Sequence, residues 1–172
     1  MAELWDVYDS AGNKTGRLHT RGEKLADGDY HLVVHIWIVN ARGEFLITKR
    51  AAEIPFGGYW QATGGAAVAG DDSITAALRE TQEEIGVILP TEEGIHVTRY
   101  TRSDCVTDVW LFRHDCALSD LTLQPEEVAD AMWADVPTVR RTWREGRLYQ
   151  YSHYSLDDIT ACCKRHWEDL PL

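Results

Sequence analysis

The sequence predicts a mixed α/β fold of the α+β kind, with strands first, a helix between strands, and helices at the end. The strongest indication is the near-continuous apolar run YHLVVHIWIV at residues 30–39, which is typical of a strand buried on both faces. Residues 72–86 show apolar side chains at a 3-4 spacing, which indicates an amphipathic helix. The alternating stretches 95–101 and 104–115 favour two further strands. A chain of 172 residues is expected to form one domain.

The first part of the chain divides into strands and turns. Residues 3–19 are predicted to form a hairpin, and the polar stretch 21–29 is predicted to be a loop. After the buried strand, the turn residues NARG at 40–43 lead to an antiparallel partner strand at 44–50. The Pro- and Gly-rich residues 51–60 are expected to form a connector to the central helix.

The central helix carries its own start and stop signals. Asp71, Asp72 and Ser73 supply short polar side chains that cap a first turn, and their acidic groups suit the positive end of the helix dipole. Gly86 is placed to end the helix in a left-handed conformation. The apolar face between these signals consists of Ile74, Ala77, Leu78, Thr81 and Ile85.

The second half ends in two predicted helices. Residues 119–128 are expected to be a loop and 129–136 a short strand. Pro137 is suited to the first turn of a helix through Arg144, ended by Gly146. Residues 155–158 resemble a capping box and predict the start of a last helix.

Composition narrows the class of protein. The chain is 44% hydrophobic and 26% charged, which is typical of a globular domain. It shows no apolar stretch of membrane-spanning length and no signal-peptide pattern, so we expect a cytoplasmic protein that does not use a membrane. The net charge of −11, without a basic stripe, argues against a nucleic-acid polymer as partner. No zinc-type spacing joins the four cysteines, which are expected to be free thiols: Cys105, Cys116, Cys162 and Cys163.

Three acidic residues of the central helix are candidates for metal binding. Glu80, Glu83 and Glu84 share one side of the helix at positions i, i+3 and i+4. Like charges at this spacing destabilise an isolated helix, whereas Mg²⁺ or Mn²⁺ binds carboxylate oxygens. Gly64 and Gly65 precede the helix and let the backbone approach the same cation. The alternative interpretation is a solvated acidic face.

The whole stretch resembles the signature of the Nudix hydrolases, G-x5-E-x7-R-E-U-x-E-E-x-G-U, in which U is aliphatic. Seven of the nine positions match at the family spacing: Gly65, Arg79, Glu80, Glu83, Glu84, Gly86 and Val87. Asp71 stands in place of the first Glu, and Thr81 in place of the first aliphatic residue. A match at so many fixed offsets favours the metal site over the solvated face.

The resemblance implies a fold and a reaction. The fold is a Nudix-type α/β/α sandwich with a central mixed β-sheet, a single domain over 1–172 with a hairpin extension at 1–29 and a C-terminal helix within 147–172. The reaction is Mg²⁺- or Mn²⁺-dependent hydrolysis of a diphosphate linkage in a small organic or nucleoside diphosphate. The partner is thus a small molecule, and the protein is expected to be a monomer or homodimer.

The resemblance also assigns roles to residues. Glu80, Glu83, Glu84 and the Gly64 carbonyl are expected to bind the metal, and Arg79 to hold a glutamate in place. Glu127 is the candidate for a further ligand or general base; Glu126 is its rival, and a solvated loop acid is the alternative.

Three residues near the connector are candidates for substrate binding. Lys49 and Arg50 end a strand where they can meet phosphate, although such a pair is as often surface charge. Trp60 is a candidate for stacking on the organic part of the substrate, with core packing as the alternative. Asp71 is one methylene shorter than the family Glu, so the contact that the Glu makes is expected to be met through water or not at all. If that contact mainly braces the loop, activity is expected to survive at some cost.

The closest competing interpretation is an isopentenyl-diphosphate isomerase, whose branch of the superfamily the chain resembles over residues 3–155. That chemistry uses a Cys and a metal-binding His. The corresponding positions in this sequence are Gly65 and Ala67, and neither residue can donate a proton or bind a metal. Of the other isomerase ligands only His31 is matched fully. A third interpretation is a non-catalytic Nudix binding module, in which Asp71 marks the loss of activity.

Overall fold

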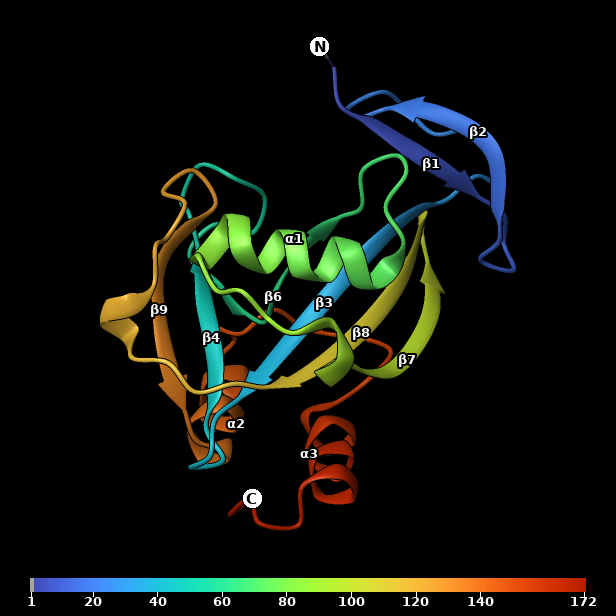
Figure 1. Ribbon diagram of the computed structural model, residues 1–172. Helices are drawn as coiled ribbons and strands as arrows, with labels where there is room; N and C mark the ends of the chain where they lie inside the picture. Colours follow the sequence, from blue (N-terminus) through green and yellow to red (C-terminus); the bar gives the residue numbers. More distant parts are fainter. Residues whose placement is uncertain (1) are drawn as a thin grey trace.

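The computed structural model describes residues 2–172, which form a central sheet between helices and a separate N-terminal hairpin (Figure 1). The helices are α1 (Ser73–Ile85), α2 (Val136–Arg144) and α3 (Leu156–His166). The strands are β1 (Leu4–Tyr8), β2 (Lys14–Thr20), β3 (His31–Val39), β4 (Phe45–Arg50), β5 (Trp60–Gln61), β6 (Thr63–Ala66), β7 (Ile95–Arg102), β8 (Cys105–Arg113) and β9 (Val128–Ala134). Single 3-10 turns lie at Thr91–Glu93 and Leu118–Asp120.

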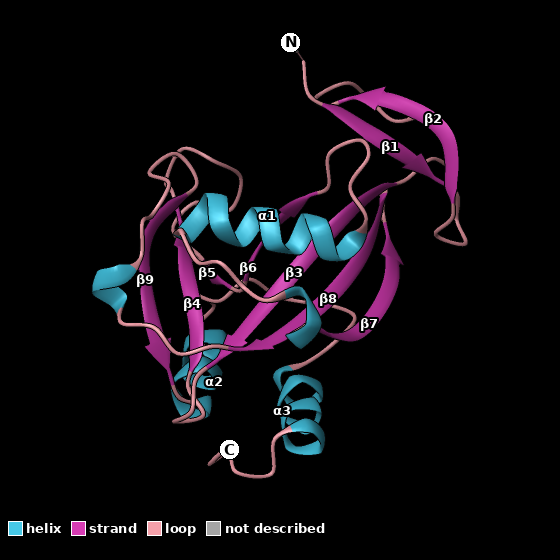
Figure 2. Cartoon of the chain, viewed as in Figure 1, coloured by secondary structure: helices cyan, strands magenta, loops and turns pink. Residues whose placement is uncertain are grey.

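The central sheet is mixed, as expected. Its strand order is β5-β4-β3-β8-β7, with β6 also paired to β3 and β9 to β4 (Figure 2). Strands β3 and β8 run parallel over their whole length, from the pair His31 and Cys105 to the pair Val39 and Arg113. Strand β4 is the predicted antiparallel partner of β3, but it pairs only with the last two residues because β6 occupies the other part of that edge.

Each face of the sheet carries its own hydrophobic core. Side chains alternate along β3, so that Ile36 and Ile38 pack with Ala77 of α1, whereas Trp37 packs with Val139 of α2 and Ile159 of α3. Helix α1 therefore covers one face, and α2 with α3 covers the other (Figure 1). This arrangement confirms the predicted α/β/α fold class.

Helix α1 begins and ends as its sequence predicts. The Asp72 carboxylate accepts a hydrogen bond of 2.8 Å from the Thr75 amide, and Gly86 caps the other end with a φ of 74°. The Thr81 hydroxyl is buried and donates to the Ala77 carbonyl at 2.8 Å, so an apolar position of the Nudix signature is filled by a satisfied polar group.

One prediction for the sheet was wrong in part. The first half of β3 is not buried on both faces, since His31 and His35 are half-buried. Aromatic side chains cover this end of the strand instead of a helix: Trp5 stacks on His31, and Tyr151 meets His35 edge-on. The connector 51–60 is irregular up to its last residue, and the stretch after it, for which no element was predicted, forms β5 and β6. Glycine disfavours strands, and these two segments become strands because β5 pairs with β4 and β6 pairs with β3.

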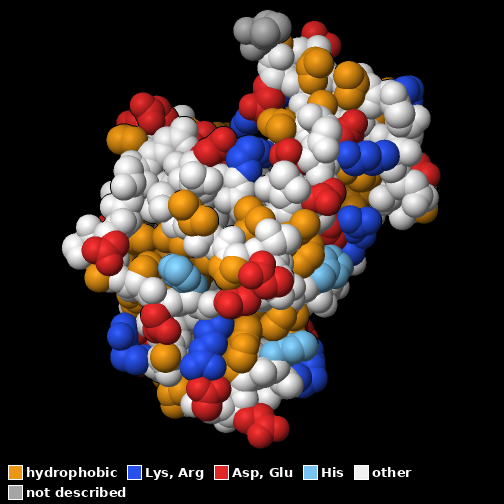
Figure 3. All heavy atoms as spheres, viewed as in Figure 1, with side chains coloured by type: hydrophobic (Ala, Val, Ile, Leu, Met, Phe, Trp, Pro, Cys, Tyr) orange, Lys and Arg blue, Asp and Glu red, His pale blue; other side chains and the backbone are white. Residues whose placement is uncertain are grey.

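All four cysteines are free thiols. No helix within residues 2–172 has both the length and the apolar character needed to cross a bilayer. On the face shown in Figure 3, basic side chains lie between acidic ones, so this face carries no continuous basic stripe.

A buried carboxylate joins the N-terminal hairpin to the central sheet. Asp108 of β8 accepts two hydrogen bonds from Arg99, at 2.7 and 2.6 Å, and one contact of 2.9 Å from His96. Arg99 also donates to the Gly12 carbonyl in the hairpin at 3.3 Å. Burial raises the pKa of Asp108, but its hydrogen bonds, the one from Arg99 foremost, and the Arg99 charge together outweigh burial and lower the pKa overall.

We predict that Asp108→Asn lowers the free energy of unfolding by about 2 kcal/mol, because a buried carboxylate loses its charge while Arg99 keeps its own. This value is reduced because the Arg99 side chain is 42% exposed and solvent weakens its interaction with Asp108. Urea denaturation measures it. The matched control is Asp169→Asn, which breaks a two-bonded pair with Arg113 at an acid that is 65% exposed, and it should change stability much less than Asp108→Asn does. Equal effects of the two substitutions would contradict the buried role of Asp108.

Candidate active site

Helix α1 turns two of its three candidate glutamates inward. Glu84 is only 5% exposed, and the Glu80 side chain is 13% exposed, one turn away on the same side. Glu83 differs from the prediction, since its side chain is 54% exposed and lies against Arg79. The structure thus brings two carboxyl groups together and leaves the third at the rim.

The two glycines bring the backbone of β6 against these carboxyl groups. The Gly64 amide donates to the Glu84 carboxylate at 3.3 Å. A Cβ atom at Gly65 would collide with the Glu80 carboxylate, so no other residue fits there without moving that side chain. Glycine at position 64 has the stronger steric cause, because a Cβ atom there would collide with the Val34 backbone.

Arg79 joins the loop before α1 to the helix itself. Its guanidinium contacts Asp71 at 3.0 Å, Glu80 at 3.0 Å and Glu83 at 2.8 Å. It also donates to the Ala66 carbonyl at 3.1 Å. Burial alone disfavours the Arg79 charge, yet the neighbouring carboxylates raise its pKa. Asp71 thus reaches Arg79 directly despite its shorter side chain.

Burial makes the inward carboxyl groups costly to ionise. It raises the pKa of Glu84 to about 8, with a further contribution from the charge of Glu80, while the Gly64 amide opposes the shift. Burial also raises the pKa of Glu80, against the influence of Arg79. Two acidic groups with raised pKa values, side by side, favour a positively charged ligand between or beside them.

The loop before β9 closes the C-terminal end of α1. The Gln124 amide donates to the Glu84 carbonyl at 2.9 Å, and the Ala51 amide to the Glu127 carbonyl at 2.9 Å. Glu127 is half-buried, and its charge contributes to the raised pKa of Glu84, whereas Glu126 is exposed. The position of Glu127 therefore favours it over its rival.

The substrate-binding candidates separate onto different sides. Arg50 acts on Glu84 electrostatically and is held by Gln61 at 2.9 Å and the Pro55 carbonyl at 2.8 Å. Lys49, the next residue along β4, points to the opposite face because strand side chains alternate. Trp60 is buried in the core beneath α2 and α3, as its alternative interpretation held.

These residues suit a divalent cation in their chemistry. No three acidic, His or Cys side chains within residues 2–172 already form a group that would hold a metal ion. The donors that do converge are the carboxyl groups of Glu80 and Glu84, beside a strand backbone free of Cβ atoms at Gly64 and Gly65. Hard cations complete such a set with carbonyl oxygen, water and substrate oxygen.

The sequence did not predict two contacts that support the site. The Ala66 carbonyl anchors Arg79, and the Gln61 side chain orients Arg50. A backbone carbonyl leaves no trace in residue type. Gln61 could have been found only by knowing that Thr48 pairs with it and so sets it beside Arg50.

The isomerase positions are unsuited to that chemistry. Gly65 lies against Glu80 and Ala67 is buried, so neither supplies an acid or a ligand. His31 stacks on Trp5 with the ring centroids 4.0 Å apart. Asp108 is occupied by Arg99 and His96.

The fold and the signature geometry define a Nudix protein, and the comparisons agree. A family model described as the NUDIX domain matches residues 29–154. The chain belongs to the Nudix hydrolase family, whose enzymes hydrolyse diphosphate bonds and generally use divalent metals.

Similar proteins include hydrolases and isomerases. An uncharacterized Nudix hydrolase of Listeria monocytogenes is 38% identical over 151 residues, which cover 87% of this chain and 89% of that protein. The isopentenyl-diphosphate Delta-isomerase of Shigella flexneri is 30% identical over 145 residues, 78% of each chain. This isomerase likeness confirms the branch that the sequence suggested.

Solved structures share the fold. DR0079 of Deinococcus radiodurans has a TM-score of 0.71 at 18% identity, over 96% of this chain and 99% of that one. The NUDIX domain of Shewanella oneidensis NrtR, solved in complex with ADP ribose, has a TM-score of 0.62 at 18% identity, over 86% and 94% of the two chains.

The raised pKa of Glu84 predicts how stability depends on pH. Its folded value of about 8 exceeds the ordinary 4.5, so the folded state binds this proton more tightly. The contribution is therefore complete at low pH and is lost as the pH rises toward 8. Without divalent cation, the urea concentration at the unfolding midpoint should decrease as the pH is raised from about 5 to about 8.5.

Glu84→Gln should lessen this decline, because the amide does not titrate. Added Mg²⁺ should stabilise the unmodified protein at high pH more than the variant. Glu92→Gln, at an exposed acid of the first 3-10 turn, is the control and should keep the decline. The same pH dependence in all three proteins would contradict the shift.

Proposed function

We propose that this protein is a Mg²⁺- or Mn²⁺-dependent diphosphatase that hydrolyses the P–O–P linkage of a small organic or nucleoside diphosphate. The observation that carries the proposal is the burial of Glu80 and Glu84 side by side against Gly64 and Gly65. A pair of buried acids has no benefit for stability on its own, and a cation explains its retention.

Each residue has a defined role in this proposal. Glu80 and Glu84, with the Gly64 carbonyl, bind the cation, and Glu83 joins them by turning from the rim. Glu127 is the further acid, as a ligand or as the base that takes a proton from the attacking water. Arg79 is a positioning residue, since its hydrogen bonds end on Asp71, Glu83 and the Ala66 carbonyl.

The bound cation supplies charge neutralisation for the diphosphate and activation of a water molecule. The chain itself supplies orientation and electrostatics. Arg50 lies on the same side of the sheet as Glu84 and is positioned to meet a phosphate oxygen. Lys49 and Trp60 receive no support from their places in the fold and are not assigned to the substrate.

The proposed substrate class is based on the family to which the chain belongs and not on the shape of a pocket that would fit one particular compound. The Shewanella domain binds ADP ribose, a small molecule with a diphosphate linkage. We extend to this chain only the diphosphate and its small organic partner. The isomerase alternative lacks the proton-donating residue that its chemistry needs at Gly65. A non-catalytic binding module would show saturable ligand binding without release of phosphate.

The direct test is Mg²⁺-dependent phosphate or monophosphate release from a panel of nucleoside, sugar, thiamine and prenyl diphosphates. At least one compound should be turned over. Glu84→Gln should lower kcat by about 10²-fold or more, because one electrostatic element of the site is lost. Glu92→Gln should leave kcat within about twofold. Saturable binding with no turnover of any compound would leave the binding module as the better interpretation.

The positioning role of Arg79 predicts a different signature. Arg79→Lys keeps the charge but loses the fork that contacts Asp71 and Glu83 together. We expect kcat to fall about tenfold with KM changed less than about threefold, because substrate is not touched. Arg113→Lys, which alters a surface pair with Asp169, is the control. A large rise in KM alone would place Arg79 on the substrate instead.

A further inference from the structure

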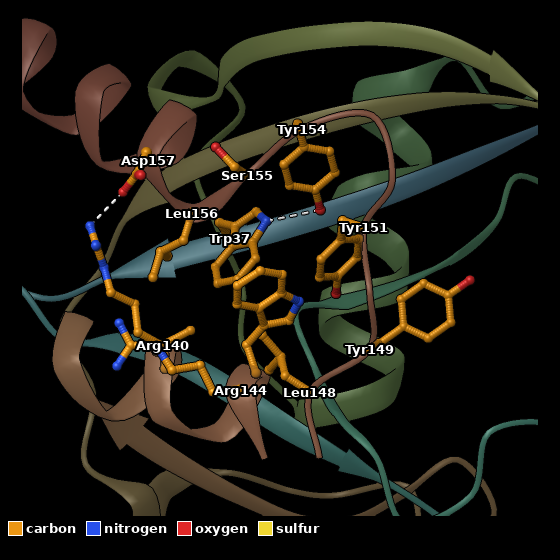
Figure 4. A pocket seen from close by; sticks show the side chains of 12 residues that line it. Trp37, Arg140, Arg144, Leu148, Tyr149, Tyr151, Tyr154, Ser155, Leu156 and Asp157 are labelled. Atoms are coloured by element: carbon orange, nitrogen blue, oxygen red, sulfur yellow. Dashed lines mark hydrogen bonds and ion pairs between the residues drawn. The ribbon is translucent and has the colours of Figure 1, made fainter. Parts of the chain in front are cut away.

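A pocket lies on the face of the sheet opposite to α1. It encloses about 220 Å³ between α2, the segment 148–157 and Trp37 of β3 (Figure 4). Trp37 belongs to the core beneath α2 and α3, whereas Glu80 and Glu84 lie on the helix that covers the other face. The proposed diphosphatase chemistry does not use this pocket.

The bottom of the pocket is formed by aromatic side chains whose polar atoms already have hydrogen-bond partners in the protein. The Trp37 indole donates to the Tyr154 hydroxyl at 3.1 Å, and the Tyr151 hydroxyl accepts from the Ala62 amide at 2.8 Å. Figure 4 shows Trp37, Tyr151 and Tyr154 on one wall. Trp37 and Tyr154 are almost fully buried and close the bottom of the pocket, whereas the half-buried Tyr151 and the exposed Trp143 offer apolar ring surface to a ligand.

The rim carries positive charge. Arg140 and Arg144 stand one turn apart on α2 and line the pocket. Arg140 is paired with Asp157 at the start of α3. Arg144 takes part in none of the ion pairs or side-chain hydrogen bonds of the described residues. One guanidinium at the mouth is therefore available to an anion.

The local charge is unusual for this chain. The protein has a net charge of −11, yet four arginines occur between positions 140 and 147: Arg140, Arg141, Arg144 and Arg147. Arg147 is paired with Glu145, and Arg141 contacts the Thr138 hydroxyl. The concentration of positive charge beside an aromatic hollow selects for negative ligands over neutral ones.

The volume limits the size of the ligand. An apolar cavity of about 150 Å³ in another protein holds one benzene ring. At about 220 Å³, this pocket has room for one ring or two fused rings, with the charged group at the mouth.

We propose that this pocket binds a small planar aromatic anion, with the ring on Trp143 and Tyr151 and the anionic group on Arg144. Two sources share this chemistry, namely the aromatic part of a nucleoside monophosphate and a free aromatic acid. The inference does not depend on the diphosphatase proposal, because it concerns binding on the other face of the sheet.

Calorimetric titration with 2-naphthoate tests the proposal, and tryptophan fluorescence provides a second readout from Trp37 and Trp143. We expect saturable binding of one 2-naphthoate per chain. Arg144→Ala should weaken it about tenfold, the value of one charge-assisted hydrogen bond, and should leave the affinity for neutral 2-naphthol within about twofold. Arg141→Ala is the matched control on the same helix, outside the pocket, and should change neither affinity more than about twofold.

Leu156→Trp fills the pocket and should abolish binding, with a thermal unfolding curve to verify that the variant folds. Glu84→Gln should bind 2-naphthoate unchanged, which separates this result from the fate of the diphosphatase proposal. Displacement of 2-naphthoate by AMP identifies the nucleotide as the source, and no displacement identifies a free aromatic acid. Absence of saturable binding, or equal effects of Arg144→Ala and Arg141→Ala, overturns the proposal.

Discussion

The contacts of Arg79 are the constraint on which the candidate site depends. One guanidinium connects the loop before α1, through Asp71 and the Ala66 carbonyl, to the helix itself, through Glu80 and Glu83. This loop contains Gly70, which has high conformational entropy in the unfolded chain, so an anchor with several hydrogen bonds helps to keep the loop against the helix. This anchoring also keeps β6 beside Glu84, which places the backbone and both inward carboxyl groups in one location.

The same location stores an electrostatic cost. Glu80 and Glu84 are buried near one another, and the raised pKa of Glu84 expresses the free energy needed to ionise it there. A chain selected for stability alone would place apolar side chains at these positions. Local departures of this kind are expected where a site binds charged ligands, and here the rest of the helix compensates with a satisfied cap at Asp72 and a left-handed end at Gly86.

The parallel pairing of β3 with β8 gives the molecule two separate faces. Alternation along β3 sends Ile36 toward α1 and Trp37 toward α2 and α3, so each face acquires its own core. One face presents acidic groups suited to a cation, and the other presents aromatic rings with arginines at the rim. Because a sheet is only one residue thick, Tyr151 on the second face still reaches the Ala62 amide, close to the glycines of the first.

The sequence alone predicted most of the elements and the Nudix signature. Periodicity identified β3 and α1, capping residues marked both ends of α1 and the start of α3, and fixed spacing identified the Nudix signature, because these features depend on neighbours within a few positions. Tertiary structure decided what depends on distant partners. It turned Glu83 outward onto Arg79, placed Lys49 and Trp60 away from the glutamates, and made a glycine-rich stretch into β6. Side-chain direction and strand pairing are set by the whole packed fold, and no local pattern records them.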